Sequence, residues 1–375
     1  MQEKSPILNR PLRVLHIISG DLWAGAESQA FTLLKHLHSS TTLHVVLMND
    51  GELSRRLQSL DIPVTIISES EFSSIQILTK LIKIIRQFKP DVLHTHRQKE
   101  NILGNAANLI SSLPFGKRAA SVRTSHGAPE FAPKGKQKIQ VWLDNWVGKY
   151  LQQGVIAVSS ELAIKLGKIF PSDKIHVIHN GVDTTELHAQ KNVADFRMQD
   201  PKSLHIGIIG RIEPVKRIDI FIVMASLLLK DKTSSLSLKF HIIGDGSLRS
   251  AMEEKVSALD LSDYIHFHGH RTDMAACIYS LDAIVMCSDH EGTPMTALEA
   301  LALGTPLIAN SVGGLNEILE HLANFLVSPN IPDEYARKIH EALKENVAVS
   351  LDKKFTATAN AQLTLSTYQN LSGRQ

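Results

Sequence analysis

Two carboxylates eight positions apart, Glu291 and Glu299, mark the stretch of the chain with the most chemically useful side chains. A carboxylate oxygen only accepts hydrogen bonds, so its natural partners in a ligand are hydroxyl groups. The residues between them begin with a glycine, beside which a ligand can approach the backbone closely. They are Gly292, Thr293, Pro294, Met295 and Thr296. We therefore expect a binding site for a ligand that carries hydroxyl groups.

The elements on either side of this stretch predict where the ligand binds. Residues 283–287 form a short apolar run, which is typical of a strand buried on both faces. Thr293 is the expected N-cap and Pro294 the expected first residue of a helix that Gly304 ends. A helix that starts at the carboxyl end of a parallel strand attracts anions through its unpaired N–H groups. Phosphate beside hydroxyl groups indicates a nucleotide or a sugar phosphate.

A second glycine-rich turn is expected at the same edge of the sheet. Gly313 and Gly314 follow the apolar run 306–309 and precede Glu317 at the start of another expected helix. The alternative is that Glu291 is a solvated loop residue and Glu299 an ordinary charge on a helix surface. The second turn favours the ligand site.

Two cations, Arg211 and Lys216, follow another apolar run that ends at Gly210. A guanidinium fork and an ammonium group are both suited to binding a diphosphate. The alternative is that both are ordinary solvated charges, because basic loops are common. Their place at the carboxyl end of a strand favours a diphosphate site.

One of the 18 histidines, His126, is a candidate functional residue. A histidine is by default a surface or core residue, but His126 directly follows a buried strand and precedes Gly127. His94 and His96 lie two positions apart on a strand and therefore on one face. No third ligand is apparent near them, so we expect no metal site there.

Length and composition limit the class of protein. The 375 residues are enough for two domains, and a formal net charge of +2 gives no general argument for nucleic-acid binding. Cys277 and Cys287, both in apolar surroundings, favour a reducing compartment over a disulfide framework. The apolar run 220–229 is shorter than the roughly 18 residues that span a bilayer, and no signal peptide is recognisable. We expect a cytoplasmic protein.

Short apolar runs alternate with helical patterns along the chain, which predicts an α/β fold with parallel, doubly wound sheets. The expected strands are 14–18, 44–48, 64–67, 92–94, 119–123, 155–158, 204–210, 240–243, 266–267, 283–286, 307–309 and 325–327. The polar run 184–203 lacks periodicity and is the expected linker. We expect one domain over residues 1–190, a second over 191–354 and a final helical segment over 355–375, with strand ends of both domains facing a cleft.

Taken together, these residues resemble the retaining GT-B glycosyltransferases of family four. The resemblance extends from Arg13 to about Val327 and lies in several short motifs that follow the family's order. They are residues 24–27, His126 with Gly127, residues 180–183, Gly210 and Arg211 with Lys216, residues 244–246, Glu291 with Glu299, and Gly313 and Gly314 with Glu317. The fold that the resemblance implies is GT-B, with two Rossmann-like domains facing a central cleft.

The family resemblance also implies a division of labour among the candidate residues. A nucleotide-sugar donor, most commonly a UDP-sugar, would be held by the second domain and an acceptor by the first. Arg211 and Lys216 would neutralise the diphosphate in place of a metal ion, so no metal or other cofactor is expected. Glu291 would accept from hydroxyls of the donor sugar and Glu299 from those of the ribose. His126 would lie near the anomeric carbon, with Gly25, Gly210, Gly244 and residues 292–296 around the donor.

The resemblance further implies transfer to a glycan or lipid-linked acceptor in bacterial surface polysaccharide or lipopolysaccharide biosynthesis, and a final helix that returns to the first domain. The chain departs from the family pattern at three positions. Ala24 stands where a second glycine is common, Cys287 where a proline often lies, and Arg217 where a glycine usually follows the lysine.

Three other functions share parts of this pattern. A dehydrogenase should carry Gly-x-Gly-x-x-Gly after its first strand, and neither residues 20–25 nor residues 207–210 have that spacing. A sugar-nucleotide epimerase of the same architecture would differ from a transferase in its product. A non-catalytic module that binds nucleotide-sugars would leave the paired cations and carboxylates without a task.

An expected helix in the basic half interleaves cationic and aromatic residues, which is typical of docking to an anionic membrane surface. These residues are Lys134, Lys136, Lys138, Trp142, Trp146, Lys149 and Tyr150. The alternative is that both tryptophans belong to the hydrophobic core.

Overall fold

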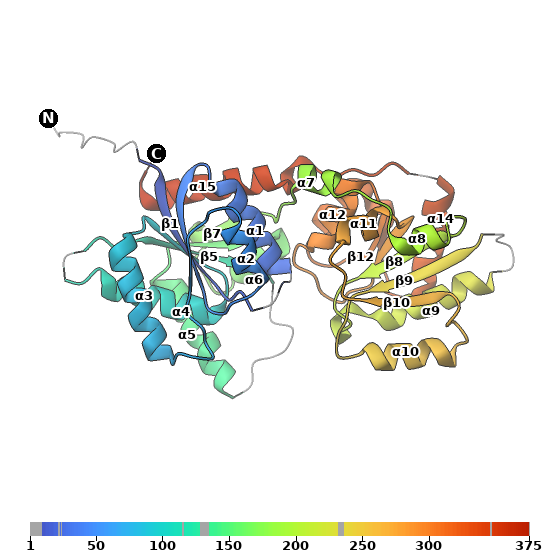
Figure 1. Cartoon of the computed structure of the whole chain (residues 1–375), viewed down its shortest axis with the longest axis horizontal. Helices are drawn as coiled ribbons and strands as arrows, with labels where there is room; N and C mark the ends of the chain where they lie inside the picture. The colour runs from blue at the N-terminus through green and yellow to red at the C-terminus, as the bar shows by residue number, and fades with distance from the viewer. Residues whose placement is uncertain are drawn as a thin grey trace. The chain divides into compact units, whose positions relative to one another are not determined.

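The computed structural model describes residues 10–21, 23, 25–114, 116–127, 135–231, 236–345 and 347–374. The chain divides into two compact units, which Figure 1 shows as the blue-to-green part with a red helix and the green-to-red part. The first unit consists of Met1–Gly181 and Ala357–Gln375, and the second of Val182–Thr356. The division after Gly181 lies nine residues before the expected boundary at residue 190, and the last helix belongs to the first unit.

The first unit is built on a seven-stranded parallel sheet with the order β3-β2-β1-β4-β5-β6-β7. Its strands are β1 (Leu12–Ile18), β2 (Thr41–Leu47), β3 (Val64–Ile66), β4 (Val92–Thr95), β5 (Ala120–Ser125), β6 (Gly154–Ala157) and β7 (Ile175–Val177). Its helices are α1 (Gly25–Leu37), α2 (Glu52–Gln58), α3 (Ser74–Phe88), α4 (Gln98–Ser111), α5 (Lys136–Tyr150), α6 (Ser160–Leu166) and α15 (Ala357–Ser372), with a 3-10 turn η1 (Ser172–Lys174).

Alternating side chains of the strands fill two separate cores in this unit. Val14 and Ile18 of β1 pack in a core with residues of α1, α2 and α15. Leu15 and Ile17 of the same strand pack in the other core, with residues of α3 and α4. Helices therefore cover both faces of the sheet, which explains why the strands are apolar at consecutive positions and parallel.

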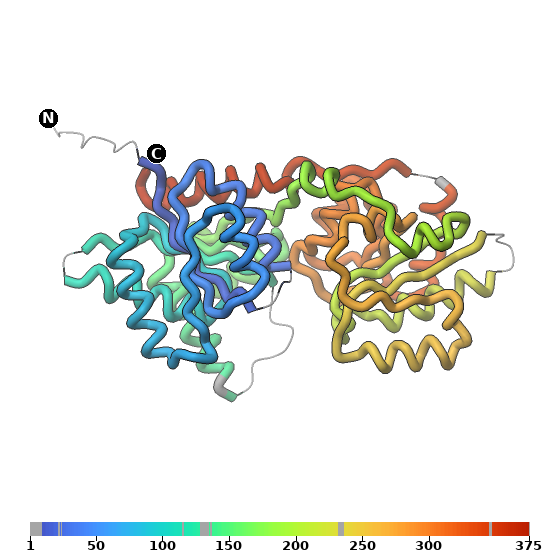
Figure 2. The backbone as a smooth tube through the Cα atoms, viewed as in Figure 1, coloured from blue at the N-terminus to red at the C-terminus, as the bar shows by residue number. Residues whose placement is uncertain are grey.

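The second unit contains a six-stranded parallel sheet with the order β10-β9-β8-β11-β12-β13, whose backbone is traced in Figure 2. Its strands are β8 (Leu204–Ile209), β9 (Leu238–Ile243), β10 (Ile265–Gly269), β11 (Ala283–Met286), β12 (Leu307–Asn310) and β13 (Leu326–Val327). Its helices are α7 (Thr184–Ala189), α8 (Asp195–Gln199), α9 (Ile218–Lys230), α10 (Arg249–Ala258), α11 (Met274–Tyr279), α12 (Met295–Leu303), α13 (Leu315–Ile318) and α14 (Pro332–Glu345). Three 3-10 turns, η2 (Pro214–Lys216), η3 (Glu320–Phe325) and η4 (Lys353–Phe355), complete it.

The expected α/β class with parallel, doubly wound sheets is confirmed, and each expected strand is present within a few residues. Strand β7 was not expected, because none of its three residues is buried and it follows a short turn. The expected linker over residues 184–203 is wrong, since it contains the helices α7 and α8. Both are too short for a helical period of apolar residues to be visible in the sequence.

Candidate active site

The candidate donor-binding residues of the second unit follow neighbouring strands of its sheet. Strands β9, β8, β11 and β12 are adjacent in that order, and all pair in parallel. Gly244 follows β9, Gly210 follows β8, and residues 287–294 and 311–314 follow β11 and β12. Between β8 and β11 the strand order reverses, which is where open sheets of this kind bind ligands. The loops that carry the candidate residues therefore lie at one edge of the sheet.

Glycines allow these loops to touch one another through their backbones. A Cβ atom on Gly313, which has a φ of +55°, would lie 1.8 Å from the carbonyl oxygen of Glu291. The N–H of Gly314 donates to the carbonyl oxygen of Gly292 at 2.8 Å. Similarly, a Cβ atom on Gly244 would lie 2.0 Å from the carbonyl oxygen of Gly210. No larger residue fits at Gly313 or Gly244 without moving the loop that carries a candidate residue.

Lys216 and Glu291 form an ion pair, with Nζ and Oε1 2.5 Å apart. Their side chains are 22% and 9% exposed, so the pair is largely shielded from water. From the sequence, Lys216 is expected to bind a diphosphate and Glu291 to bind sugar hydroxyls, as separate groups. Because the loops after β8 and β11 are neighbours, the ammonium group and the carboxylate occupy one small polar centre.

Further contacts hold these two loops together. The N–H of Asp289 donates to the carbonyl oxygen of Val215 at 2.9 Å. Arg217 donates to Asp219 at 3.0 Å and to Asp289 at 3.2 Å, and these contacts raise the pKa of its guanidinium. Arg217, at which the sequence departs from the family pattern, is thus a structural cation. Arg211 is exposed.

Helix α12 starts one residue later than expected. Pro294 has an extended backbone and is the N-cap, so the expected cap at Thr293 is wrong. The Pro294 carbonyl accepts from the N–H groups of Ala297 and Leu298, which places the N–H groups of Met295 and Thr296 ahead of the first helical hydrogen bond. Thr293 and Met295 are buried, and Pro294 and Thr296 are partly buried.

Glu299 lies one helical turn after Met295 and is partly buried. Burial raises the pKa of its carboxyl to about 7. Within the described part of the chain, no side chain donates a hydrogen bond to this carboxyl, although its neighbour Glu291 is paired with Lys216. Glu299 is therefore a hydrogen-bond acceptor held in a poorly solvated place without a partner of its own.

The candidate residues of the first unit are Gly25, which is the first residue of α1, and His126, which directly follows β5. Arg97, which the sequence analysis did not single out, holds the loop before α1. Its guanidinium lies 2.5 Å from Glu27 and 3.2 Å from Asp21. These side chains come from elements far apart in sequence, so their proximity could not be predicted without the strand order.

The sequence analysis also missed that His94 and His96 have a histidine neighbour. His16 lies opposite His94 in the paired strands β1 and β4. One ring nitrogen from each of His16, His94 and His96 lies within 4.8 Å of the others. The expectation that no third ligand is near therefore fails on geometry. The proximity of His16 follows from the pairing of β1 with β4, which the sequence alone does not give.

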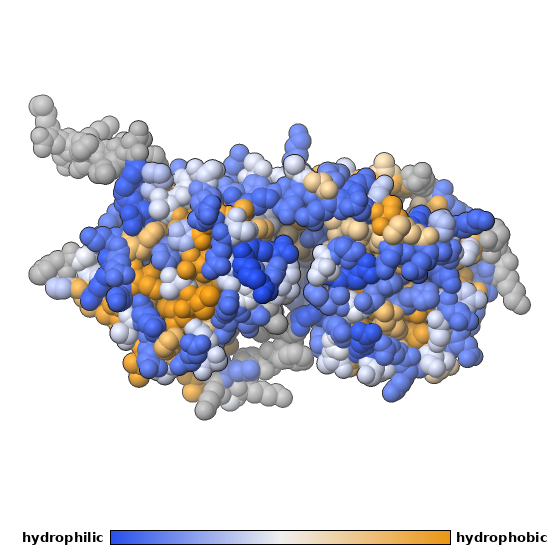
Figure 3. All heavy atoms as spheres, in the orientation of Figure 1, coloured by the Kyte–Doolittle hydropathy of each residue, from blue (hydrophilic) through white to orange (hydrophobic). Residues whose placement is uncertain are grey.

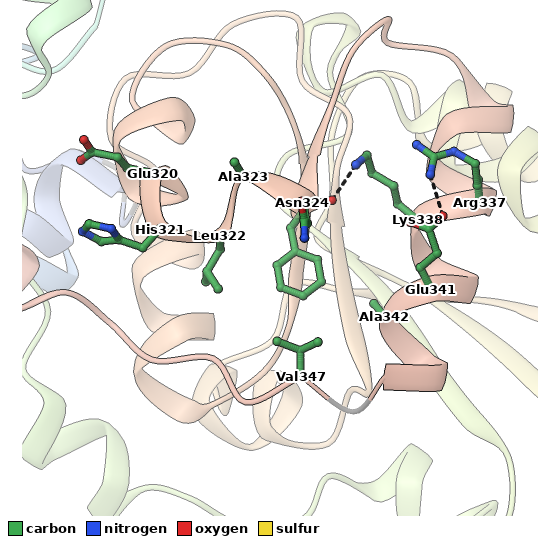
Figure 4. Close-up of a pocket in the computed structure, with 11 residues that line it drawn as sticks. Glu320, His321, Leu322, Ala323, Asn324, Arg337, Lys338, Glu341, Ala342 and Val347 are labelled. Carbon is green, nitrogen blue, oxygen red and sulfur yellow. Dashed lines mark hydrogen bonds and ion pairs between the residues drawn. The ribbon is translucent and has the colours of Figure 1, made fainter.

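A cavity of about 610 Å³ in the second unit is separate from the candidate residues (Figure 4). It is lined by residues 320–325 together with Arg337, Lys338, Glu341, Ala342 and Val347. Lys338 donates to the Asn324 carbonyl at 2.6 Å, and Arg337 pairs with Glu341 at 2.6 Å. Its cations are thus paired within the cavity wall, and no candidate residue lines it.

Helix α5 presents aromatic side chains at the surface of the first unit. Trp142 is 63% exposed and Trp146 is 44% exposed, so the alternative that both belong to the core is wrong. Lys134 lies outside the described residues, as does the side chain of Lys136, whereas Lys138, Lys149 and Tyr150 are exposed. Figure 3 shows apolar side chains at several other places on the surface of this unit. Among the described helices, none is long and apolar enough to cross a membrane.

Two sequence families match the chain. Residues 192–362 match Glycosyl transferases group 1, and residues 23–186 match Glycosyltransferase Family 4. The chain belongs to the group 1 glycosyltransferases. This confirms the family predicted from the sequence and makes the protein a transferase. The dehydrogenase, epimerase and non-catalytic alternatives are set aside accordingly.

Relatives and solved structures agree with this family. The UDP-Gal:alpha-D-GlcNAc-diphosphoundecaprenol alpha-1,3-galactosyltransferase of Escherichia coli is 24% identical over 358 residues, which cover 91% of this glycosyltransferase and 90% of the relative. Anabaena HepE in complex with UDP superposes with a TM-score of 0.74 at 20% identity, covering 96% of this chain and 98% of HepE. The lipopolysaccharide outer core galactosyltransferase WaaB superposes with a TM-score of 0.66 at 16% identity, covering 96% and 99% of the two chains. The GT-B fold predicted from the sequence is thereby confirmed.

Proposed function

We propose that this glycosyltransferase transfers a sugar from a UDP-sugar, with retention at the anomeric carbon, to a lipid-linked or glycan acceptor of a bacterial surface polysaccharide. The observation that carries the proposal is the polar centre at the β8–β11 switch point. There Lys216 pairs with Glu291, which lies in the loop before α12, and Glu299 lies one turn into that helix. A cation, a shielded carboxylate and unpaired helix N–H groups match a diphosphate that joins two hydroxyl-bearing sugars.

The cations act on the charge that develops during transfer. The bond between the anomeric carbon and the diphosphate oxygen breaks, and the electron pair leaves with UDP. The acceptor oxygen forms the new bond and passes its proton to an oxygen of the leaving diphosphate. Lys216 and Arg211 neutralise the charge that grows on the leaving diphosphate. Such a preorganised contact is worth about 3 kcal/mol in the transition state, so we expect transfer to proceed without a metal ion.

The two carboxylates divide the hydroxyl groups of the donor. Glu291, already bonded to Lys216, accepts from the transferred sugar, so that ammonium, carboxylate and sugar form one hydrogen-bonded set. Glu299, which has no described partner, accepts from the ribose hydroxyls. Its pKa of about 7 makes donor binding sensitive to pH, because the ionised carboxyl is the stronger acceptor.

Similar proteins support the choice of donor and acceptor. The Escherichia coli relative uses UDP-Gal and a diphosphoundecaprenol-linked sugar, and HepE is known in complex with UDP and with UDP-glucose. WaaB is a galactosyltransferase of the lipopolysaccharide outer core. In this chain the first unit supplies the acceptor site, and His126 contributes a hydrogen bond near the anomeric carbon.

A thermal-shift screen of UDP, GDP, ADP and NAD, followed by NMR of the product made from the matching nucleotide-sugar, tests this proposal. A ligand at a hundred times its Kd stabilises the folded protein by about 2.7 kcal/mol, which is readily measured. We expect UDP to raise the melting temperature and NAD to have no effect. The control is Glu254→Ala, because Glu254 is an exposed residue of α10 in the same unit. An inverted anomeric configuration in the product would contradict the retaining mechanism.

We further infer that α5 docks this glycosyltransferase on the inner face of the cytoplasmic membrane, where a lipid-linked acceptor would be reached. The Trp146 and Tyr150 rings are tilted against each other with centroids 5.5 Å apart, and the Lys149 ammonium lies 5.6 Å from the centroid of the Tyr150 ring. The opposite face of the helix carries Asp144, which accepts from Asn101 at 2.8 Å inside the unit. Cations beside exposed aromatic rings suit anionic headgroups above an apolar layer.

Flotation with vesicles of phosphatidylglycerol tests this docking surface. We expect the protein to float with the vesicles at low salt, and Trp142→Ala combined with Trp146→Ala to abolish flotation without changing UDP binding. Ile75→Ala is the matched control, because Ile75 is an apolar residue of α3 that is 78% exposed. Flotation that is equal for all three proteins would show that α5 is not the docking surface.

A further inference from the structure

Four stacked imidazoles lie near the carboxyl ends of neighbouring strands in the first unit, and we call them the first histidine row. His16 belongs to β1, His94 to β4, and His96 and His126 follow β4 and β5. The ring centroids of His94 and His96 are 4.5 Å apart, and those of His96 and His126 are 5.4 Å apart. Strand pairing and the period of two residues per pleat place them on one face of the sheet.

Hydrogen bonds join this row into a single chain that also includes Thr124 and Tyr368. The Thr124 hydroxyl lies 2.8 Å from His94 Nε2, and the Tyr368 hydroxyl lies 2.5 Å from His94 Nδ1 and 3.3 Å from His16 Nε2. The chain continues from His16 Nδ1 to His96 Nε2 at 3.4 Å, and from His96 Nδ1 to His126 Nε2 at 3.1 Å. It ends at His126 Nδ1, which is buried and has no hydrogen-bond partner among the described residues.

The rings of this row are neutral at ordinary pH. Burial lowers the pKa of His16 to about 3 and that of His126 to about 4, and it lowers the pKa values of His94 and His96 well below 6.5. A neutral imidazole has one N–H and one lone pair, so a ring that accepts at one nitrogen donates at the other. If the Tyr368 hydroxyl donates to one of its two ring neighbours, the chain has only two arrangements of protons, which differ in direction along its whole length.

The two directions leave different groups unsatisfied. If Thr124 donates to His94 Nε2, every ring carries its proton on Nδ1, and the one buried group left without a partner is the N–H of His126. In the opposite direction every ring carries its proton on Nε2. Then two groups have no partner among the described residues. The Thr124 hydroxyl hydrogen lacks an acceptor, and the lone pair at His126 Nδ1 lacks a donor. The first direction is favoured because it leaves one orphaned group instead of two.

We propose that this chain fixes His126 as a hydrogen-bond donor through Nδ1–H, with Tyr368 of α15 as the positioning residue that joins its two halves. The inference rests on the proposed function of His126 near the transferred sugar. It adds that His126 presents a hydrogen-bond donor, and not an acceptor, at the carboxyl end of β5. In this state the ring cannot act as a base at Nδ1, because that nitrogen already carries a proton.

A metal ion on His16, His94 and His96 would be incompatible with this chain. Both nitrogens of each of these rings already take part in it, so coordination would break at least two of its hydrogen bonds. Zinc addition is therefore a direct test. If one equivalent of zinc bound tightly and removed the N–H signals of these rings, a metal site would replace the proposed chain.

NMR of protein labelled with ¹⁵N-histidine reads the direction of the chain without any assay of activity. We expect His16, His94, His96 and His126 all to be Nδ1–H tautomers at pH 7. Tyr368→Phe should convert His16, His96 and His126 to mixtures of tautomers, and Thr124→Val should do so for His94, whereas Thr124→Ser should restore the native pattern. The control is Tyr335→Phe, which removes another fully buried tyrosine hydroxyl, in the second unit. Nε2–H tautomers in the unmodified protein would overturn the proposal.

Kinetics separate this inference from the proposed function. We expect His126→Ala to lower kcat about a hundredfold, as for loss of one donor in the transition state, and Tyr368→Phe to lower it roughly tenfold with KM unchanged. If the tautomers are as expected but His126→Ala keeps full activity, the role of His126 in transfer is wrong while the chain stands. If Tyr368→Phe leaves the signals of His126 unchanged, the positioning role of Tyr368 is wrong.

Discussion

Each of the two sheets carries a row of stacked histidines, and the two rows end differently. The second row consists of His205, His241 and His268 from β8, β9 and β10. His205 Nδ1 and His241 Nε2 are 2.8 Å apart, as are His241 Nδ1 and His268 Nε2. Its first ring meets the backbone carbonyl of Asp200 at 2.7 Å. A carbonyl only accepts, so His205 must donate through Nε2, and each ring of this row carries its proton on Nε2.

The comparison shows that the group at the end of such a row sets its direction. The carbonyl of Asp200 permits one direction in the second row, whereas the hydroxyl of Thr124 can donate or accept in the first. The second row lies beneath α8, where the Phe196 ring stacks on His241 with centroids 4.2 Å apart. The first row ends instead at the carboxyl end of β5, where Nδ1 of His126 has no hydrogen-bond partner among the described residues. We therefore propose that the second row serves stability and the first row the reaction.

Acid should produce the largest effect, because both rows depend on neutral rings. The folded pKa values of the fully buried His16 and His94 lie below the unfolded value of about 6.5, so their contribution to stability is complete above pH 6.5 and is lost as pH falls toward 3. The His16 ring alone should cost about 2 kcal/mol of unfolding free energy at pH 5. Tryptophan fluorescence in urea measures this in the first unit, which contains all three tryptophans. His94→Gln should flatten the pH dependence, and a stability equal at pH 7.5 and pH 5 would refute neutral rings.

Lys216→Ala should have the next largest effect. It tests whether the second unit takes part in transfer through residues that follow its strands and not through its histidines. Loss of the ammonium group removes about 3 kcal/mol of transition-state stabilisation, so kcat should fall at least a hundredfold. Steady-state kinetics and a melting curve measure the result. Lys230→Ala is the control, because Lys230 is an exposed residue at the end of α9. Loss of melting temperature without loss of kcat would mean that Lys216 only holds Glu291.

Glu299→Gln should weaken UDP binding by about tenfold, which corresponds to roughly 1.4 kcal/mol for one charge-assisted hydrogen bond. Because the pKa of Glu299 is about 7, the affinity of the unmodified protein for UDP should rise between pH 6 and pH 8. Calorimetry at these two pH values measures both effects. The rise should be absent in Glu299→Gln, and equal affinities of the two proteins at pH 8 would exclude a role at the ribose.

Substitution in the second histidine row should affect stability alone. His241→Asn removes the ring that is hydrogen-bonded to both His205 and His268, so it should lower the free energy of unfolding by about 1 to 3 kcal/mol. It should leave kcat and KM within about twofold of their original values. Parallel kinetics of His94→Asn, in the first row, should show a clear loss of kcat. Equal kinetic losses in both variants would end the distinction between the two rows.

A chelator should have the smallest effect. In the proposed mechanism Arg211 and Lys216 provide the positive charge at the diphosphate, and the rings of the first row are hydrogen-bonded to one another, so we expect activity in EDTA to equal that without it. The measurement is the initial rate before and after dialysis, with manganese and zinc added back separately. A rate that vanishes in EDTA and returns with one of these metals would contradict both assignments.

The strands and the loops that follow them were predictable because each buried parallel strand is a short apolar run with turn residues behind it. The pairing of side chains between loops was not. Lys216 and Glu291 are 75 positions apart, and their contact follows only from the adjacency of β8 and β11. The place of Glu299 one turn into a helix was predictable from the helix signals alone, although those signals gave a start one residue too early.

The histidine rows show the same limit more strongly. His94 and His96 were recognised as lying on one face, which depends on local geometry. Their partner His16 lies 78 positions before His94, and their partner Tyr368 lies 274 positions after it. Nothing local in α15 marks Tyr368, because that helix lacks a pronounced apolar face. Such contacts depend on the order of strands and on the return of the last helix.

That return has a consequence for the order in which the protein assembles during synthesis. Domains usually fold as they leave the ribosome, beginning with the amino-terminal one. Here Ala361 and Tyr368 of α15 belong to the same core as Val14 and Leu34, and they are translated only after the whole second unit. Until α15 is synthesised, the first unit therefore has an exposed hydrophobic seam where α15 will pack, and water can still reach its histidines. Chaperones that bind apolar segments would find their longest-lived target in this seam, and release of the finished chain would close it.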